Sequence, residues 1–101
     1  MSADESRLDL SVGPDGALTL DGEIDSFTAP SLAARLSDDP TIDVVDLAEV
    51  TFIDSSGLRV LLQTHHDRVS TGATLTLRAP SASVQRLLEI SGLDTHLVVV
   101  N

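Results

Sequence analysis

The sequence predicts a single α/β domain with a mixed, mostly parallel sheet. Three features of the 101-residue chain support this prediction. Two short segments of alternating apolar residues flank a turn near the N-terminus, three segments with helical apolar spacing follow, and strand-like apolar segments lie between and after them. Strands joined by a tight turn run antiparallel, whereas strands joined through helices run parallel. The expected order is β-β-α-β-α-β-α-β.

The first two strands form a predicted hairpin. Apolar residues alternate with polar ones over Leu8–Val12 and again at Leu18 and Leu20, and the cluster Gly13–Gly16 separates the two segments. Alternation on both sides of a Gly/Pro/Asp cluster is typical of an antiparallel pair. Residues Met1–Glu5 are polar and are expected to form a short disordered tail.

The first helix is expected to begin at Thr28. Thr28 is a suitable N-cap, and Pro30 is tolerated in a first turn. Phe27 before this cap and Leu32 after it have the spacing of a hydrophobic staple. The helix should end before Ser37–Pro40, a loop signal that closes with proline.

A central strand and a second helix follow. Apolar residues nearly fill Thr41–Phe52, as expected for a strand covered on both faces. The next segment is expected to be helical up to Gly72, because five of its residues repeat at helical spacing. These residues are Leu58, Leu61, Leu62, His65 and Val69. Arg59 falls on another face of this helix, where it is either solvated or a contact.

The last three elements complete the parallel part of the sheet. Ala73–Leu77 alternates as a strand does, and a third helix is expected to open after Pro80-Ser81. Gly92 is a suitable C-terminal cap for that helix. Leu97–Val100 is expected to be a short final strand.

The amino-acid composition limits which classes of molecule the chain is expected to bind. Six Arg and no Lys face sixteen acidic residues, which gives a formal net charge of −10. This charge disfavours nucleic acid and anionic membranes and favours a basic protein surface, although it could equally serve solubility. No apolar run approaches the roughly 18–20 residues of a membrane span, and the N-terminus is unlike a signal peptide. We therefore expect a soluble, cytoplasmic domain that binds neither nucleic acid nor membrane.

The segment Asp54–Gly57 is the most informative motif. It follows an apolar strand directly and precedes a helix, so that two serine hydroxyls lie at a helix N-terminus. Unpaired N–H groups and the helix dipole favour an anion there, whereas Asp54 would repel one. Such a site suits a reversible charge switch. From the local sequence alone, ordinary capping by Asp54 or either serine is the favoured explanation of these residues.

Other candidate sites are incomplete. Asp25 with Glu23 could form an acid/base or metal site, but nothing completes either one, and loop capping is the simpler role. His65 and His66 lack a third ligand, and His65 falls on the apolar face of its helix. The chain contains no cysteine and no phosphate-cradling glycine loop. Neither serine lies in a G-x-S-x-G elbow. We expect no catalytic residues, no metal and no cofactor.

Two blocks of sequence resemble the STAS domain family, specifically its small stand-alone anti-sigma factor antagonists. One block is Leu20–Asp25, followed by Thr28-Ala29 and Leu32. The other runs from Val45-Asp46-Leu47 through Phe52–Leu58. The resemblance covers essentially the whole chain, so that residues 1–101 are expected to form one STAS domain. The D-S-S-G segment behind a strand is the more specific of the two.

This resemblance implies a partner-switching mechanism. The unphosphorylated antagonist binds an anti-sigma factor that is also a serine kinase, which frees the sigma factor. The kinase then phosphorylates the antagonist, and a serine phosphatase resets it. In the family the second serine is modified, which here is Ser56. Asp54 and Asp25 match the acidic positions of this loop and of the neighbouring loop.

The expected partner surface combines these loops with the start of the second helix. Its members are Asp25, Ser26, Thr28, Asp54, Ser55, Gly57, Leu58 and Arg59. Gly57 is expected to bare the backbone to a partner, and Ser55 to bridge strand and helix through its hydroxyl. Ser56, nearer the N–H groups of the first helical turn, is the better phosphate acceptor.

Two alternatives remain open at this point. The chain could be a STAS subunit of another assembly, such as a lipid-transport complex or a stressosome. Less favoured is a small hydrolase that uses paired carboxylates, since a chain this short has little room for the deep pocket it would need.

Overall fold

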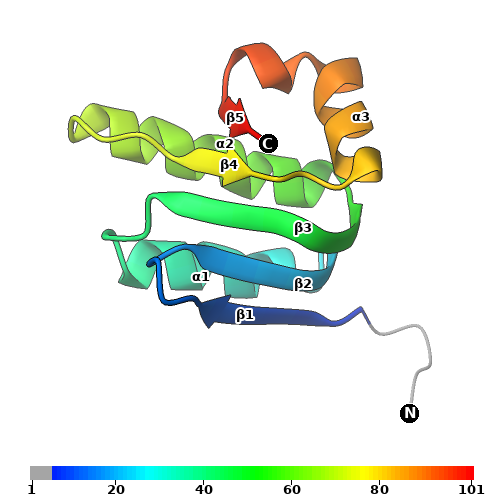
Figure 1. Ribbon diagram of the computed structural model, residues 1–101, viewed down its shortest axis with the longest axis horizontal. Coiled ribbons are helices and arrows are strands. Elements are labelled where there is room, and N and C mark those ends of the chain that lie inside the picture. Colours follow the sequence, from blue (N-terminus) through cyan, green and yellow to red (C-terminus); the bar gives the residue numbers. More distant parts are fainter. Residues whose placement is uncertain (1–5) are drawn as a thin grey trace.

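The computed structural model describes residues 6–101, which form a five-stranded sheet and three α-helices (Figure 1). Residues 1–5, where the sequence predicts a disordered tail, lie outside the described residues. The strands are β1 (Leu8–Val12), β2 (Leu18–Ile24), β3 (Val44–Ile53), β4 (Thr76–Arg78) and β5 (Val98–Val100). The helices are α1 (Ala29–Asp38), α2 (Ser55–Ser70), α3 (Ala82–Ser91) and a short 3-10 helix, η1 (Leu93–Thr95).

The sheet confirms the predicted fold class. Its strands lie in the order β1-β2-β3-β4-β5; β1 pairs antiparallel with β2, and every later pair is parallel. The carboxyl ends of β2, β3 and β4 therefore meet at one edge of the sheet, on the right in Figure 1. This edge carries the loop after β2 and the start of α2. The short helix η1 is an addition that the sequence pattern did not predict.

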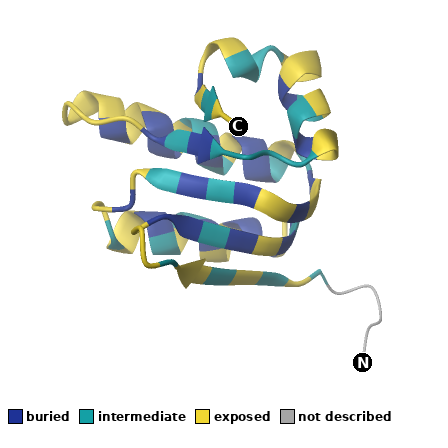
Figure 2. Cartoon of the chain, viewed as in Figure 1, coloured by how far each residue is buried: buried dark blue, intermediate teal, exposed yellow. Residues whose placement is uncertain are grey.

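One face of the sheet carries the core. Helices α1 and α2 lie together behind the sheet, and α3 and η1 lie at its β5 end (Figure 1). Buried residues concentrate in β2 and β3 and along the inner sides of the helices (Figure 2). Leucine, isoleucine and valine supply most of this core, while aromatic residues supply none of it. Ser81 Oγ donates to the carbonyl oxygen of Val50 at 2.7 Å and ties the start of α3 to β3.

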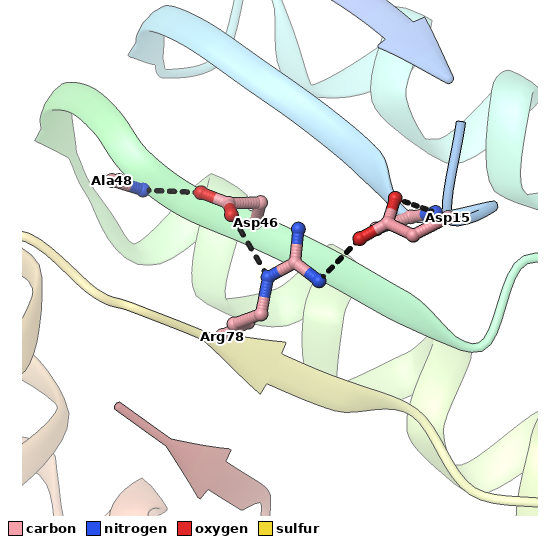
Figure 3. A network of polar contacts seen from close by, with 5 residues as sticks. Asp15, Asp46, Ala48 and Arg78 are labelled. Carbon is pink, nitrogen blue, oxygen red and sulfur yellow. Dashed lines mark hydrogen bonds and ion pairs between the residues drawn. The ribbon is translucent and has the colours of Figure 1, made fainter. Parts of the chain in front are cut away.

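The prediction that the central strand is covered on both faces is wrong. The other face of the sheet is open, and the residues of β3 that point to it are polar or partly exposed. On this face Arg78 contacts Asp15 at 2.7 Å and Asp46 at 2.9 Å, and so links β4 to β3 and the β1–β2 turn (Figure 3). The hydrogen bond from Arg78 lowers the pKa of Asp15. Because helices cover only one face of the sheet, this network stays partly exposed to solvent.

The start of α1 differs from the sequence prediction. Thr28 occupies the N-cap position, but its side chain makes no capping hydrogen bond. Its hydroxyl instead accepts from the N–H of Asp25 and donates to the carbonyl of Glu23. Phe27 is 80% exposed and does not form the expected staple with Leu32. The reason is that the Asp25–Thr28 turn, rather than an apolar contact, fixes the entry into the helix.

At the C-terminal end of α2, the buried face of the helix differs from the predicted one. Val69 is 52% exposed, whereas Arg68 is only 8% exposed. The long arginine side chain reaches past the end of α1, where unpaired carbonyl groups accept its hydrogen bonds. His65 is buried as predicted, and its Nδ1 accepts from the N–H of Leu75 at 3.4 Å.

Arg68→Ala should lower the free energy of unfolding by about 3 kcal/mol, because the substitution leaves buried carbonyl groups of α1 and the following loop without a donor. Arg86→Ala, at an exposed position of α3, is the matched control and should change stability little. Urea unfolding of both variants checks the prediction. Equal stability of the two would show that water replaces Arg68 at no cost.

Candidate functional site

The junction between β3 and α2 is built around Asp54. One carboxylate oxygen of Asp54 accepts the N–H of Ser56 at 2.8 Å and that of Gly57 at 3.4 Å, which caps the helix. The backbone N–H of Asp54 donates to the carbonyl of Ile24 at 3.1 Å. The residue therefore fixes the start of α2 and joins the end of β3 to the end of β2. The sequence left open whether Asp54 or one of the serines caps α2, and in the structure Asp54 is the cap.

Gly57 permits close packing of α2 on the sheet. A Cβ at this position would lie 2.6 Å from Cγ2 of Ile24 and 2.7 Å from Cγ1 of Ile53. Both distances are far below van der Waals contact, so a side chain does not fit without movement. Gly57 is buried. The expectation that it bares the backbone to a partner is therefore wrong: its role is to bring the helix against the two strand ends.

The two serines lie in the first turn of α2. Ser55 is exposed and Ser56 is partly exposed. Within residues 6–101 neither hydroxyl makes a hydrogen bond, because Asp54 alone supplies the cap. The bridging hydrogen bond expected from Ser55 is thus not formed. Both hydroxyls remain available to an approaching reagent or partner.

The neighbouring loop after β2 is organised by Asp25. Its carboxylate accepts the N–H of Phe27 at 2.9 Å and of Thr28 at 3.2 Å, and it also accepts the hydroxyl of Ser6. The Ser6 hydrogen bond, followed by these backbone N–H groups, lowers the pKa of Asp25. Asp25 is therefore a loop cap, the simpler of the two roles considered from the sequence. Within the described residues, no cluster of acidic and histidine side chains could hold a metal ion.

The structure brings the two loops together at one edge of the sheet. Ile24 pairs with Ile53, and Asp54 bonds to Ile24, so the loops begin side by side. Ser26, Ser55 and Arg59 are exposed in this region. The remaining predicted site residues Thr28 and Leu58, like Gly57, are buried. They support the surface from beneath.

Sequence reasoning missed the apolar part of this edge. Phe27 lies in the loop after β2, and Phe52 is the penultimate residue of β3. Phe27 is 80% exposed, and Phe52 faces solvent with Ile90 of α3, itself 72% exposed. Phe52 and Ile90 both line a small hollow beside α3. The sequence carries no signal for this exposure, since composition shows only that the chain has two Phe and no Tyr or Trp.

Comparison with known proteins identifies the fold family. The model of the STAS domain family matches residues 10–100. The chain is a STAS domain. The match includes both strand-end loops and the whole sheet apart from the first residues of β1. STAS domains of this kind are regulatory rather than enzymatic.

Relatives of this STAS domain carry regulatory names. The anti-sigma-F factor antagonist RsfB of Mycobacterium tuberculosis is 32% identical over 81 residues, covering 76% of this chain and 66% of that protein. The anti-sigma-B factor antagonist of Listeria monocytogenes is 32% identical over 84 residues, covering 79% of this chain and 74% of that protein. An anti-sigma factor antagonist from Mycobacterium paratuberculosis has a crystal structure with a TM-score of 0.73 and 26% identity, covering 98% of this chain and 88% of that one.

No helix of this STAS domain, within residues 6–101, is long and apolar enough to cross a membrane.

Gly57→Ala should destabilise the domain by about 1–3 kcal/mol, because the new methyl group overpacks the contact with Ile24 and Ile53. Thermal or urea unfolding measures the loss. Ser55→Ala, two residues earlier and exposed, is the control and should change stability much less. A Gly57→Ala variant as stable as the wild type would show that the helix has room to move away from the strands.

Asp25→Asn should remove a pH-dependent part of the stability. The folded-state pKa of Asp25 is lowered, so its charged form stabilises the fold above the unfolded value of about 4, and this contribution is lost as pH falls through the folded pKa. The stability difference between wild type and Asp25→Asn should therefore shrink on acidification. Urea midpoints across this range measure it; a difference independent of pH would contradict the assignment.

Proposed function

We propose that this STAS domain is an anti-sigma factor antagonist whose complex with its partner is ended by phosphorylation of Ser56. The observation that carries the proposal is the pair of unbonded serine hydroxyls at the start of α2, next to the carboxylate of Asp54. Relatives named as antagonists support the choice of partner class and favour it over a subunit of a lipid-transport complex or a stressosome.

The partner surface is the edge formed by the two strand-end loops and the first turn of α2. Its exposed polar members are Ser26, Ser55 and Arg59, together with partly exposed Asp25, Asp54 and Ser56. Phe27 and Phe52 add the apolar area that a stable contact needs. Buried Thr28, Gly57 and Leu58 hold this surface in shape. An acidic chain with an apolar edge suits a basic partner surface with an apolar centre.

Phosphorylation at Ser56 would act through local charge. A phosphoserine carries about −1.5 to −2 charge at neutral pH. Asp54 already accepts the N–H groups of Ser56 and Gly57, so the phosphate cannot use these donors unless Asp54 leaves them. Either outcome changes the surface that a partner meets: the phosphate projects outward beside a carboxylate, or the cap rearranges. The buried supports of the loop need not move, so the fold is retained.

The chain itself supplies only the acceptor hydroxyl. In the proposed cycle the anti-sigma factor is a serine kinase that binds ATP, and Ser56 Oγ takes the terminal phosphoryl group while ADP leaves. A separate serine phosphatase hydrolyses the phosphoserine and restores the binding form. A kinase that draws on cellular ATP and controls a sigma factor implies a cytoplasmic, transcription-regulating role for this phosphoprotein.

Ser56 should be the modified residue. After incubation with the anti-sigma kinase and Mg-ATP, wild type and Ser55→Ala should each gain one phosphate, whereas Ser56→Ala should gain none and still bind the kinase. Intact-mass and tandem mass spectrometry measure this. Phosphate localised to Ser55 in the wild type, or full phosphorylation of Ser56→Ala, would show the assignment to be wrong.

Arg59→Glu should weaken binding to the anti-sigma factor by about tenfold or more, because it removes the guanidinium donors that Arg59 offers to the partner and puts in their place a carboxylate, which cannot donate a hydrogen bond. Arg35→Glu is the matched control: it makes the same change in net charge in the last turn of α1, at the other edge of the sheet. Calorimetric titration compares the two. Equal affinities would remove Arg59 from the interface.

A further inference from the structure

A groove of about 610 Å³ lies between α1 and α2. Its apolar lining comes from both helices and from the loops that follow them, through Ala33, Leu36, Val60, Pro40 and Ala73. Sites for small molecules occupy about 300–1,000 Å³ and are mostly apolar with a few convergent polar groups. The groove has this size and this kind of lining.

Several polar residues also line the groove, among them Arg59, Asp67 and Arg68, and Arg68 is the buried one of these three. Its Nε donates to the carbonyl of Ile42 at 3.3 Å, and Nη2 donates to the carbonyls of Ile42 at 3.0 Å, Leu36 at 3.1 Å and Asp39 at 3.4 Å. These bonds cap the end of α1 and hold the guanidinium in one position. The side chain is thus held in place, and only Nε and Nη2 donate these structural hydrogen bonds.

The remaining nitrogen of the Arg68 guanidinium is Nη1. It makes no hydrogen bond within residues 6–101, yet every fully buried side-chain nitrogen and oxygen in this range has a partner. Nη1 is therefore at least partly accessible to solvent. Because Arg68 lines the groove, we expect a ligand in the groove to reach Nη1. This largely buried arginine thus keeps one nitrogen, Nη1, accessible as a hydrogen-bond donor.

The charge of Arg68 is only partly compensated, by a Coulombic interaction with Asp39 and without a direct ion pair. All of its acceptors are backbone carbonyls, and no carboxylate of the described residues lies within 4.0 Å of it. Buried arginines are normally paired with an acid, since a charge removed from water needs a counter-charge. The dipole of α1 offsets only part of this charge. The groove therefore has two cationic side chains beside its apolar wall: Arg68, fixed and with Nη1 unbonded within residues 6–101, and the exposed Arg59.

We infer that the groove binds a small amphiphilic carboxylate, such as a medium-chain fatty acid. Its carboxylate would accept from Nη1 of Arg68, and its apolar chain would cover Leu36 and Val60. A singly charged head group fits better than a phosphate monoester, because Asp67 also lines the groove and the chain carries a net charge of −10. This inference does not rest on phosphorylation of Ser56, although Arg59 belongs both to the groove lining and to the proposed partner surface.

Titration with sodium decanoate, below the concentration at which it forms micelles, tests the site in the full chain. Amide NMR signals from Ala33, Val60 and Ala73 should shift in a saturable manner. Decyltrimethylammonium, which has the same tail and the opposite charge, should not reproduce these shifts. Absence of saturable shifts with decanoate, or equal binding of the cation, would overturn the inference.

Two substitutions locate the binding. Ala33→Phe fills the groove and should weaken decanoate binding by about tenfold or more. Ala34→Phe, on the next and exposed position of α1 outside the lining, should leave the affinity unchanged. If Ala33→Phe does not fold, Ala73→Phe at an exposed position of the rim replaces it with the same expectation. Unchanged affinity in the groove-filling variant would place the ligand elsewhere and overturn the site.

Discussion

The contact between the start of α2 and the ends of β2 and β3 is the constraint on which the rest of the site depends. Asp54 closes the helix N-terminus and bonds to the end of β2, while Gly57 lets the helix approach Ile24 and Ile53. With these two residues in place, the two serines make no hydrogen bond through their hydroxyls within residues 6–101. Their hydroxyls remain free at the surface, which is what a modifiable acceptor requires.

This arrangement also explains how a small domain can change its surface without changing its fold. The loop after β2 is held by its own cap at Asp25, and the helix is held by Asp54. Thr28 and Leu58 lie buried beneath the loops. Under the proposed function, we therefore expect that charge added at Ser56 changes the contact with the partner and leaves the core in place.

Much of the fold could be read from the sequence because local signals agreed with it. Apolar alternation at Leu8–Val12 and helical spacing in the three later segments gave the order of elements correctly. Gly92, expected as a C-terminal cap, has a φ of 77° and serves as one. The face of α2 was misjudged at Val69, because no apolar pattern signals that an arginine will reach the carbonyl end of another helix.

The sequence predicted where the residues of the candidate site lie, but it predicted their structural roles less well. The two acidic residues and the serines lie together as expected, since parallel strand ends share an edge. The role of Gly57 could not be deduced, because it depends on how close α2 lies to Ile24 of β2, where a Cβ at position 57 would come within 2.6 Å of Cγ2. The exposure of Phe27 and Phe52 could not be predicted for a similar reason. An apolar residue near the end of a strand is expected in the core unless it is known which elements cover it.

The central claim is that phosphorylation switches binding through local charge at a rigid junction. The most direct test compares unphosphorylated and Ser56-phosphorylated protein for affinity to the anti-sigma factor, with amide NMR spectra of both forms. We predict a large loss of affinity, with spectral changes confined to the Asp54–Arg59 and Asp25–Thr28 segments. Unchanged affinity, or a loss of affinity accompanied by changes throughout the core strands, would contradict the claim.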